Sequence, residues 1–356
     1  MAELSEAIKI KATGRCALVG NPFDLVGQAE AKMKQLIEVD GAILSIPIRN
    51  LYASATLKLA DEFIIIAPRS KFKNLIDCID ELKIRGVGDW EHIADMAIVV
   101  FGEIMAKLGL EVQPLKVKII LKTCIPRQRG LSGSSGMITA IIFALLKAHN
   151  AENELTVKEL AQYVLKVENQ LGVTAGLQDR ILQAAYVFDP KIDAVFMDFG
   201  VESRREGCDF SPLKLSDRKR MFSSALILSS QPSHSGKVHK PIVAKLRRRG
   251  KRIIRAFSEL GEIGYHARNA FMTGDWFELG GMMTATAEKR IEIYGEEVLG
   301  PLNMAIVEAC RAAGVYWNFT GSGGAVVAML PEGDESFDRL KIEVEKRGNF
   351  EIYRLT

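Results

Sequence analysis

The sequence has little of what marks secreted or membrane proteins. It contains only five cysteines in 356 residues, and no two of them form a Cys-x-x-Cys pair. An odd, scattered set argues against a disulfide framework, so we expect buried thiols in a reducing compartment. The longest strongly apolar stretch, residues 137–146, is too short for a bilayer span of about 20 residues. The first residues also lack a signal-peptide pattern. These absences predict a cytoplasmic protein with no membrane partner.

The chain also lacks a large charge of one sign. Its net charge is only +3 at pH 7, which gives no case for a polyanionic partner. One basic run, residues 247–252, could touch nucleic acid, but no aromatic residues lie among its cations to stack bases. A solvated helix end is the interpretation we favour. The five histidines lack the spacing of a zinc site. We therefore expect a small-molecule partner and no nucleic acid, in a monomer or homodimer.

Length and patterning predict two domains of mixed structure. At roughly 150 residues per domain, the chain has room for about two. Between residues 193 and 224 the helical period is lost and polar residues increase, which indicates a boundary. We place the domains at residues 1–210 and 211–356. Strands and helices follow one another without strict βαβ alternation, which favours an α+β fold.

Periodicity and capping signals place several elements. Apolar and lysine side chains alternate over residues 115–124, as in a half-buried strand, and an apolar helix is expected over residues 134–149. Thr156 and Glu159 form a capping box, and the helix that it starts should end near Leu171. A further helix is expected near residue 177, and strands are expected at 225–229, 315–319, 325–330 and 350–354. Two more helices are expected, one at 337–347 and one that has Pro301 in its first turn.

A loop rich in glycine and serine joins the strand at 115–124 to the apolar helix. Such a loop can turn backbone N–H groups toward an anion, and the helix N-terminus adds partial positive charge. A small-residue turn with serine N-caps is the alternative. The nucleotide motifs Gly-x-x-x-x-Gly-Lys-Ser/Thr and Gly-x-Gly-x-x-Gly are absent, which disfavours P-loop NTPases and Rossmann dehydrogenases. The candidate phosphate-binding residues are Pro126, Gly130, Leu131, Ser132, Gly133, Ser134, Ser135 and Gly136.

Two acidic residues follow this loop. Glu168 lies near the expected end of its helix, where a carboxylate opposes the helix dipole and needs compensation. If the residue is functional, a bound Mg²⁺ ion compensates its charge; otherwise Lys166 or solvent does so. Asp179 stands at the start of the next helical stretch, where it is either a functional carboxylate or an ordinary helix-start aspartate paired with Arg180.

Three segments together resemble the motifs of one kinase superfamily. Residues 126–135 are similar to its second motif, Pro-x-x-x-Gly-Leu-x-Ser-Ser, residues 13–24 to its first and residues 319–325 to its third. This superfamily includes galactokinase, homoserine kinase, mevalonate kinase and phosphomevalonate kinase, and is known as the GHMP kinases. Within it, residues 175–181 and 235–239 resemble the plant-type glucuronokinases.

The resemblance implies a fold, cofactors and roles for single residues. It implies an N-terminal domain like ribosomal protein S5 and a ferredoxin-like C-terminal domain, with ATP and Mg²⁺ as cofactors. Ser134 and Glu168 would hold Mg²⁺, and Asp179 would accept the proton of the attacking hydroxyl. Arg15 would lie beside Asp179, either in catalytic contact or as a structural ion-pair partner. The residues implied to bind the substrate are Asn21, Asp24, Gly321, Ser322 and Gly323.

The acceptor is the least determined part of this interpretation. A sugar 1-kinase acting on glucuronate or a related sugar is the leading hypothesis. Galacturonate, arabinose, a heptose phosphate and mevalonate are alternatives within the family, and an idle ATP- and sugar-binding sensor is an alternative outside enzymes. The sequence departs from the glucuronokinase pattern at four places: residues 27–40, Arg49, residues 283–286 and Asn318. A uronate carboxylate needs a cationic partner, and the candidates are Arg49, Arg127, Arg129, Lys237 and His239.

Overall fold

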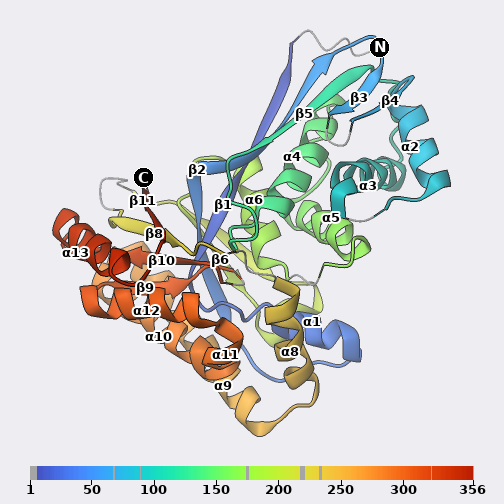
Figure 1. Cartoon of the computed structure of the whole chain (residues 1–356). Helices are drawn as coiled ribbons and strands as arrows, with labels where there is room; N and C mark the ends of the chain where they lie inside the picture. The colour runs from blue at the N-terminus through green and yellow to red at the C-terminus, as the bar shows by residue number, and fades with distance from the viewer. Residues whose placement is uncertain are drawn as a thin grey trace.

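The computed structural model describes residues 6–66, 69–88, 90–173, 176–216, 221–231, 235–321 and 323–355. Within these residues the strands form a seven-stranded sheet from the first part of the chain and a four-stranded sheet from the last part (Figure 1). Helices alternate irregularly with the strands. The α+β class expected from the sequence is therefore confirmed.

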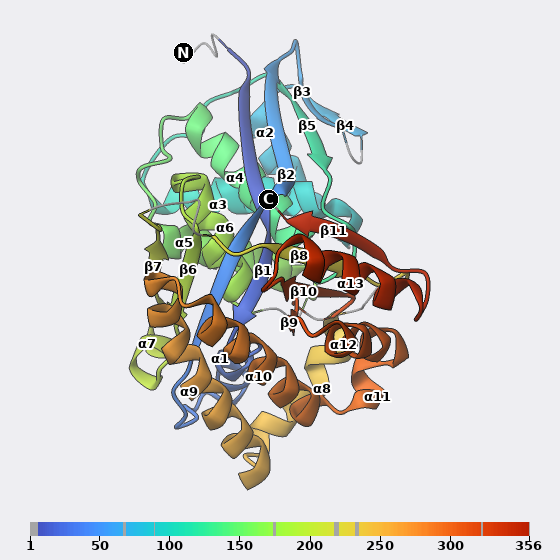
Figure 2. The ribbon, with the colours of Figure 1, turned by 90° about the vertical axis from the view of Figure 1, so that its left-hand side faces the viewer.

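Two long strands form the spine of the larger sheet. β1 (Ile8–Val19) and β2 (Ala42–Leu59) pair antiparallel along their length, and Figure 2 shows them crossing the molecule side by side. The register of β1 shifts between Thr13 and Gly14, at the first expected motif. Irregularities of this kind redirect the side chains that follow. The other strands are β3 (Phe63–Ile66), β4 (Arg69–Phe72), β5 (Val117–Thr123), β6 (Ala194–Asp198) and β7 (Asp209–Leu213), in the order β4-β3-β5-β2-β6-β7.

A layer of helices packs on the larger sheet. The central one is α4 (Gly133–Ala148), which contacts β1, β2 and the neighbouring helices. Twelve of its residues are buried, because the helix is apolar nearly all round. The expected apolar helix at 134–149 is thus confirmed. Around it lie α2 (Leu75–Arg85), the short helix at Trp90–His92, α3 (Ile93–Lys107), α5 (Val157–Gln170) and α6 (Gln178–Phe188).

The smaller sheet has the strand order of a ferredoxin-like unit. Its strands β8 (Ser224–Leu228), β9 (Tyr316–Phe319), β10 (Ala325–Met329) and β11 (Glu351–Leu355) are antiparallel in the order β11-β8-β10-β9. In chain order this is 4-1-3-2, with helices between the first and second strands and between the third and fourth. The expectation for the C-terminal part is confirmed. Its helices are α8 (Ser235–Arg247), α9 (Lys251–Thr273), α10 (Trp276–Tyr294), α11 (Glu296–Leu299), α12 (Pro301–Ala313) and α13 (Asp334–Glu345).

Several local expectations can be checked directly. The capping box of Thr156 and Glu159 is present, α5 ends at Gln170, and Pro301 begins α12. The basic run at 247–252 is exposed where α8 gives way to α9, as the solvated interpretation requires. The domain boundary placed after residue 210 falls within β7, which pairs with β6, and the smaller sheet begins at Ser224. That boundary stays a prediction.

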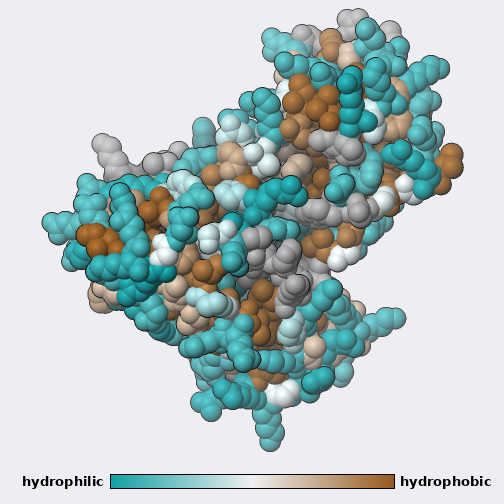
Figure 3. Space-filling model, viewed as in Figure 1, coloured by the Kyte–Doolittle hydropathy of each residue, from teal (hydrophilic) through white to brown (hydrophobic). Residues whose placement is uncertain are grey.

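The expectation of buried thiols is right for four of the five cysteines. Burial raises the pKa of Cys16 and of Cys208 to about 12, so both thiols are inert near neutral pH. Cys124 is exposed instead, because it follows the end of β5, where the strand leaves the core. No helix among the described residues is long and apolar enough to cross a membrane. The face in Figure 3 is mostly hydrophilic, with hydrophobic side chains in scattered groups.

Candidate active site

The shift in β1 turns Arg15 toward the start of α6. Arg15 is 2% exposed, and its Nη2 forms an ion pair with Oδ1 of Asp179. The backbone N–H of Arg15 donates to the carbonyl of Leu131 at 3.3 Å, which ties the first motif to the phosphate loop. Nε and Nη1 of Arg15 are buried and have no hydrogen-bond partner within the described part of the chain. These donors therefore remain available to a ligand that enters the site.

Asp179 lies between two guanidinium groups. Besides Arg15, Arg180 approaches it, with 3.4 Å between Nη1 and Oδ2. Burial raises the pKa of Asp179, but the two arginines more than offset this, so the pKa lies below its ordinary value. The carboxylate is therefore ionised at neutral pH and can accept a hydrogen bond from an attacking hydroxyl.

Arg180 links this carboxylate to the second acidic residue. Its Nε donates to Oε2 of Glu168 at 2.6 Å, its Nη2 bonds the same oxygen, and its Nη1 donates to the carbonyl of Gly176 at 2.8 Å. Glu168 is 1% exposed, so this is a buried ion pair. The compensation expected for Glu168 thus comes from Arg180, and Lys166 pairs with Glu103 at 2.8 Å instead. Sequence spacing missed this because the two residues meet only when α5 and α6 pack together.

The other oxygen of Glu168 faces the phosphate loop. Oγ of Ser134 donates to Oε1 of Glu168 at 2.9 Å. The serine and carboxylate that the resemblance assigns to Mg²⁺ are therefore in direct contact. No group of three or more His, Cys, Asp and Glu residues that could hold a metal occurs among the described residues. A hydroxyl and one carboxylate suit Mg²⁺ that keeps waters and phosphate oxygens as its other ligands.

The phosphate loop turns sharply and is bonded by a side chain of α6. Gly130 has φ 65° and Ser132 has φ 65°, so the chain turns sharply before α4 begins at Gly133. Nε2 of Gln183 donates to the carbonyls of Ser132 at 2.8 Å and of Thr13 at 2.9 Å. Leu131 and Ser135 point into the protein and are buried. Of the proposed phosphate contacts, these two can offer only backbone groups, while Ser134 is partly accessible.

The third motif closes against the phosphate loop. A Cβ built on Gly321 would lie 2.4 Å from the carbonyl oxygen of Gly130, so the two loops touch through their glycines. Oγ1 of Thr320 donates to the carbonyl of Arg129 at 3.4 Å. Gly323 has φ 98°, and Ser322 lies outside the described residues.

We expect Gly321→Ala to open this junction. The new methyl group would meet Gly130, and φ at Gly321 is +41°, which disfavours a side chain. Overpacking of this kind costs about 1–3 kcal/mol, and turnover should fall because the phosphate loop moves. Thermal unfolding and steady-state kinetics measure both. Gly281→Ala, on α10 with open space around it, is the matched control and should be neutral or stabilising. Equal behaviour of the two variants would contradict the contact.

The first motif joins the third through two buried amides. Nδ2 of Asn21 donates to the carbonyl of Phe319 at 3.0 Å, and its Oδ1 accepts from Asn318 at 2.7 Å. Asn318 also donates to the carbonyl of Leu18 at 2.8 Å. In this structure Asn21 therefore positions β9, and its contact with a sugar stays a prediction. Asn318, which departs from the family pattern, has a structural task here.

Asp24, at the N-terminus of α1 (Leu25–Met33), lies close enough to Asp179 for their charges to interact. A Cβ on Gly176 would stand 2.0 Å from Oδ2 of Asp24, so only glycine allows this approach. Burial, and then the charge of Asp179, raise the pKa of Asp24 to about 6, although Arg15 and Arg180 oppose them. The site thus pairs one firmly ionised carboxylate with one that titrates near neutral pH.

The candidate cations for a substrate carboxylate are mostly occupied. Arg49 bonds the carbonyl of Ile192 and pairs with Asp193 at 3.2 Å, while Arg129 donates to the carbonyl of Ser230 at 3.2 Å. Burial, and then the charge of Arg290, lower the pKa of His239 to about 3, so this side chain is neutral and bonds Tyr294. The side chain of Lys237 lies outside the description, and Arg127 is exposed.

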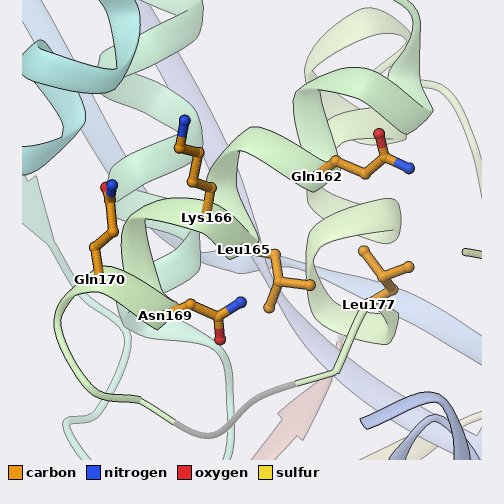
Figure 4. Close-up of a pocket in the computed structure, with 6 residues that line it drawn as sticks. All are labelled: Gln162, Leu165, Lys166, Asn169, Gln170 and Leu177. Carbon is orange, nitrogen blue, oxygen red and sulfur yellow. The ribbon is translucent and has the colours of Figure 1, made fainter. Parts of the chain in front are cut away.

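A surface cavity of about 540 Å³ lies near the end of α5 (Figure 4). Its lining consists of Gln162, Leu165, Lys166, Asn169, Gln170 and Leu177. None of the phosphate-loop or acidic residues of the candidate site faces it. We therefore locate the chemistry at the junction of the three motifs.

Known proteins are similar to this chain over nearly its whole length. A profile of the family described as "GHMP kinases N terminal domain" matches residues 91–186. Glucuronokinase 1 of Arabidopsis thaliana is 28% identical over 97% of this chain and 91% of its own length. Probable glucuronokinase 2 of the same plant is 31% identical over 94% of this chain and 87% of its own length.

A solved structure shares the fold. The galactokinase of Lactococcus lactis, complexed with galactose, has a TM-score of 0.74 at 16% identity and covers 99% of this chain and 94% of its own. At this identity the likeness concerns architecture alone. The identity to the Arabidopsis proteins over nearly the whole chain carries the family assignment. This chain belongs to the GHMP kinase family and is an ATP-dependent small-molecule kinase.

Proposed function

We propose that this kinase phosphorylates the anomeric hydroxyl of glucuronate, giving glucuronate 1-phosphate and ADP. The observation that carries the reaction is the continuous contact from Ser134 through Glu168 and Arg180 to Asp179 and Arg15. It joins the phosphate loop to the carboxylate that would receive the hydroxyl proton. The acceptor is proposed from the two glucuronokinase relatives.

In this proposal ATP lies with its phosphates at the N-terminus of α4. Backbone N–H groups of the loop and the helix dipole bind the phosphate oxygens. Mg²⁺ would be held by Ser134 and Glu168, where it would neutralise phosphate charge. Its binding would replace the Ser134–Glu168 hydrogen bond, while Arg180 keeps the carboxylate in place.

The transfer itself requires little covalent help from the protein. Asp179 accepts the proton of the anomeric hydroxyl as the hydroxyl oxygen attacks the γ-phosphorus of ATP. The unpaired Nε and Nη1 of Arg15 are placed to bind the developing charge on the transferred group. Asp24, against Gly176, accepts hydrogen bonds from other hydroxyls of the sugar and orients the ring.

An acceptor screen tests this function. ADP release would be followed with glucuronate, galacturonate, arabinose, galactose, a heptose phosphate and mevalonate, with and without Mg²⁺. Glucuronate should give the highest kcat/KM, and the product should be the 1-phosphate. Turnover of mevalonate or a neutral sugar with none for any uronate would exclude the proposed acceptor. Absence of phosphoryl transfer to every acceptor would favour the sensor.

The pH dependence of sugar binding should follow Asp24. Its pKa of about 6 means that the carboxyl is protonated at lower pH and ionised at higher pH. Since a protonated carboxyl accepts hydroxyl hydrogen bonds less strongly, KM for the sugar should rise about tenfold from pH 7 to pH 5. In Asp24→Asn the KM should be raised throughout and stay flat over this range. The same pH dependence in wild type and variant would exclude Asp24 as its source.

A further inference from the structure

Arg290 is a buried cation that the catalytic contacts leave unused. It lies on α10 and is fully buried. Its Nη1 donates to the carbonyl of Phe319 at 3.5 Å, and its Nη2 bonds the carbonyl of Gly321. Its Nε has no hydrogen-bond partner among the described residues. Among the residues that the structure describes, no carboxylate forms an ion pair with this guanidinium.

The neighbours of Arg290 belong to the first and third motifs. Thr286 lies one turn earlier on the same face of α10 and accepts from the backbone N–H of Gly20 at 3.2 Å, within the first motif. The guanidinium lies 5.2 Å from the ring centroid of Tyr294 and 5.3 Å from that of Phe319. Arg15 and Asp24 are close enough for their charges to act on it. Arg290 thus comes near Asp24, which the proposed function places at the sugar, from the C-terminal part of the chain.

A buried arginine without a carboxylate is costly. Two carbonyls, two aromatic faces and the more distant charge of Asp24 offset part of the desolvation, but the guanidinium has no ion-pair partner within the described part of the chain. The other arginines of the site already have carboxylate partners, since Arg15 pairs with Asp179 and Arg180 with Glu168. A negatively charged substrate group would supply the missing anion.

We propose that Arg290 selects a carboxylate-bearing acceptor by placing its positive charge beside the acceptor site. This inference rests on the proposed function and deepens it, because it assigns the recognition of the uronate group. The charge acts through the protein interior, where screening is weaker than in water, so direct contact is not required. Arginine suits this task because it stays protonated even when buried.

The test compares glucuronate with glucuronamide, its neutral amide of the same shape. Wild type should prefer glucuronate in kcat/KM, and Arg290→Gln should reduce that preference by about 10- to 100-fold. Most of the change should appear in KM for glucuronate. Arg290→Lys, which keeps the charge but loses the planar fork, should retain most of the preference. Arg49→Gln, a cation paired with Asp193 away from this cluster, is the matched control and should leave the ratio unchanged.

The outcomes separate this inference from the proposed function. If Arg290→Gln slows both acceptors equally, Arg290 only supports the third-motif loop and the inference is wrong. Arg290→Met serves as a second variant that buries no unpaired amide. If neither neutral variant folds, the role is structural and the inference is also wrong. If the wild type uses only neutral acceptors, both proposals are wrong. If the wild type phosphorylates uronates and its preference for glucuronate is the same in the Arg290 variants, only this inference is wrong.

Discussion

Asp179→Asn should lower kcat by about 10²- to 10⁴-fold, the range of a lost general base. Asparagine keeps the shape of the side chain but cannot take the proton of the attacking hydroxyl. It also removes the anion between Arg15 and Arg180, although Arg180 keeps its bond to Glu168. ATP binding should be nearly unchanged, because the bonds of the phosphate loop to Glu168 and Gln183 are both retained. Steady-state kinetics and nucleotide titration measure the two effects.

A matched control lies at the other end of the same helix. Asp189 follows α6, is partly exposed and pairs with Lys214 at 2.5 Å. Asp189→Asn should therefore leave kcat close to that of wild type and unfold at nearly the same temperature. If Asp179→Asn retained kcat within a few-fold of wild type, Asp179 would not be the proton acceptor. If both variants lost activity together, the effect would reflect α6 and not the carboxylate.

Local patterns in the sequence were sufficient to predict many elements after residue 115, but none before it, where the two long strands of the larger sheet lie. The capping box at Thr156, the apolar helix before His149 and the strands around residues 321–324 depend on neighbours in the chain, and all are present. Order of strands within each sheet depends on distant contacts. Only the family resemblance carried that information, through the ferredoxin-like expectation.

The candidate site shows the same division. The family resemblance predicted that Ser134 would lie with Glu168 and Arg15 beside Asp179, and each pair is in contact. No pattern in the sequence indicated that Arg180 would neutralise Glu168 or that Arg290 would pack against the third motif. Both are arginines whose partners lie on another element, so no spacing rule applies to them. A buried cation is evident only when packing is known.

Arg204→Met should lower the free energy of unfolding by about 3–5 kcal/mol, as when one partner of a buried ion pair is removed. Arg204 lies on α7 (Val201–Arg205), and its side chain is fully buried. It donates to both oxygens of Glu30 on α1 (Leu25–Met33), at 3.0 and 2.9 Å. It also bonds the carbonyls of Ile37, Val39 and Phe199. Methionine fills much of the volume but removes every guanidinium donor, so the carboxylate of Glu30 loses its ion pair and keeps the backbone N–H of Ile37 at 2.7 Å.

The adjacent arginine, Arg205, is the matched control for Arg204→Met. Arg205 is exposed and pairs with Glu202 at 3.1 Å, so Arg205→Met should change stability by no more than about 0.5 kcal/mol. The double variant Arg204→Met/Glu30→Leu should recover part of the loss, because it removes the stranded charge together with its partner. Denaturant unfolding measures all three. A loss of less than about 1 kcal/mol in Arg204→Met would contradict the role of the ion pair. The charged segment at residues 27–40 would then be held by the apolar packing of Val26, Ala29 and Ile37, and Arg204 would only fill space.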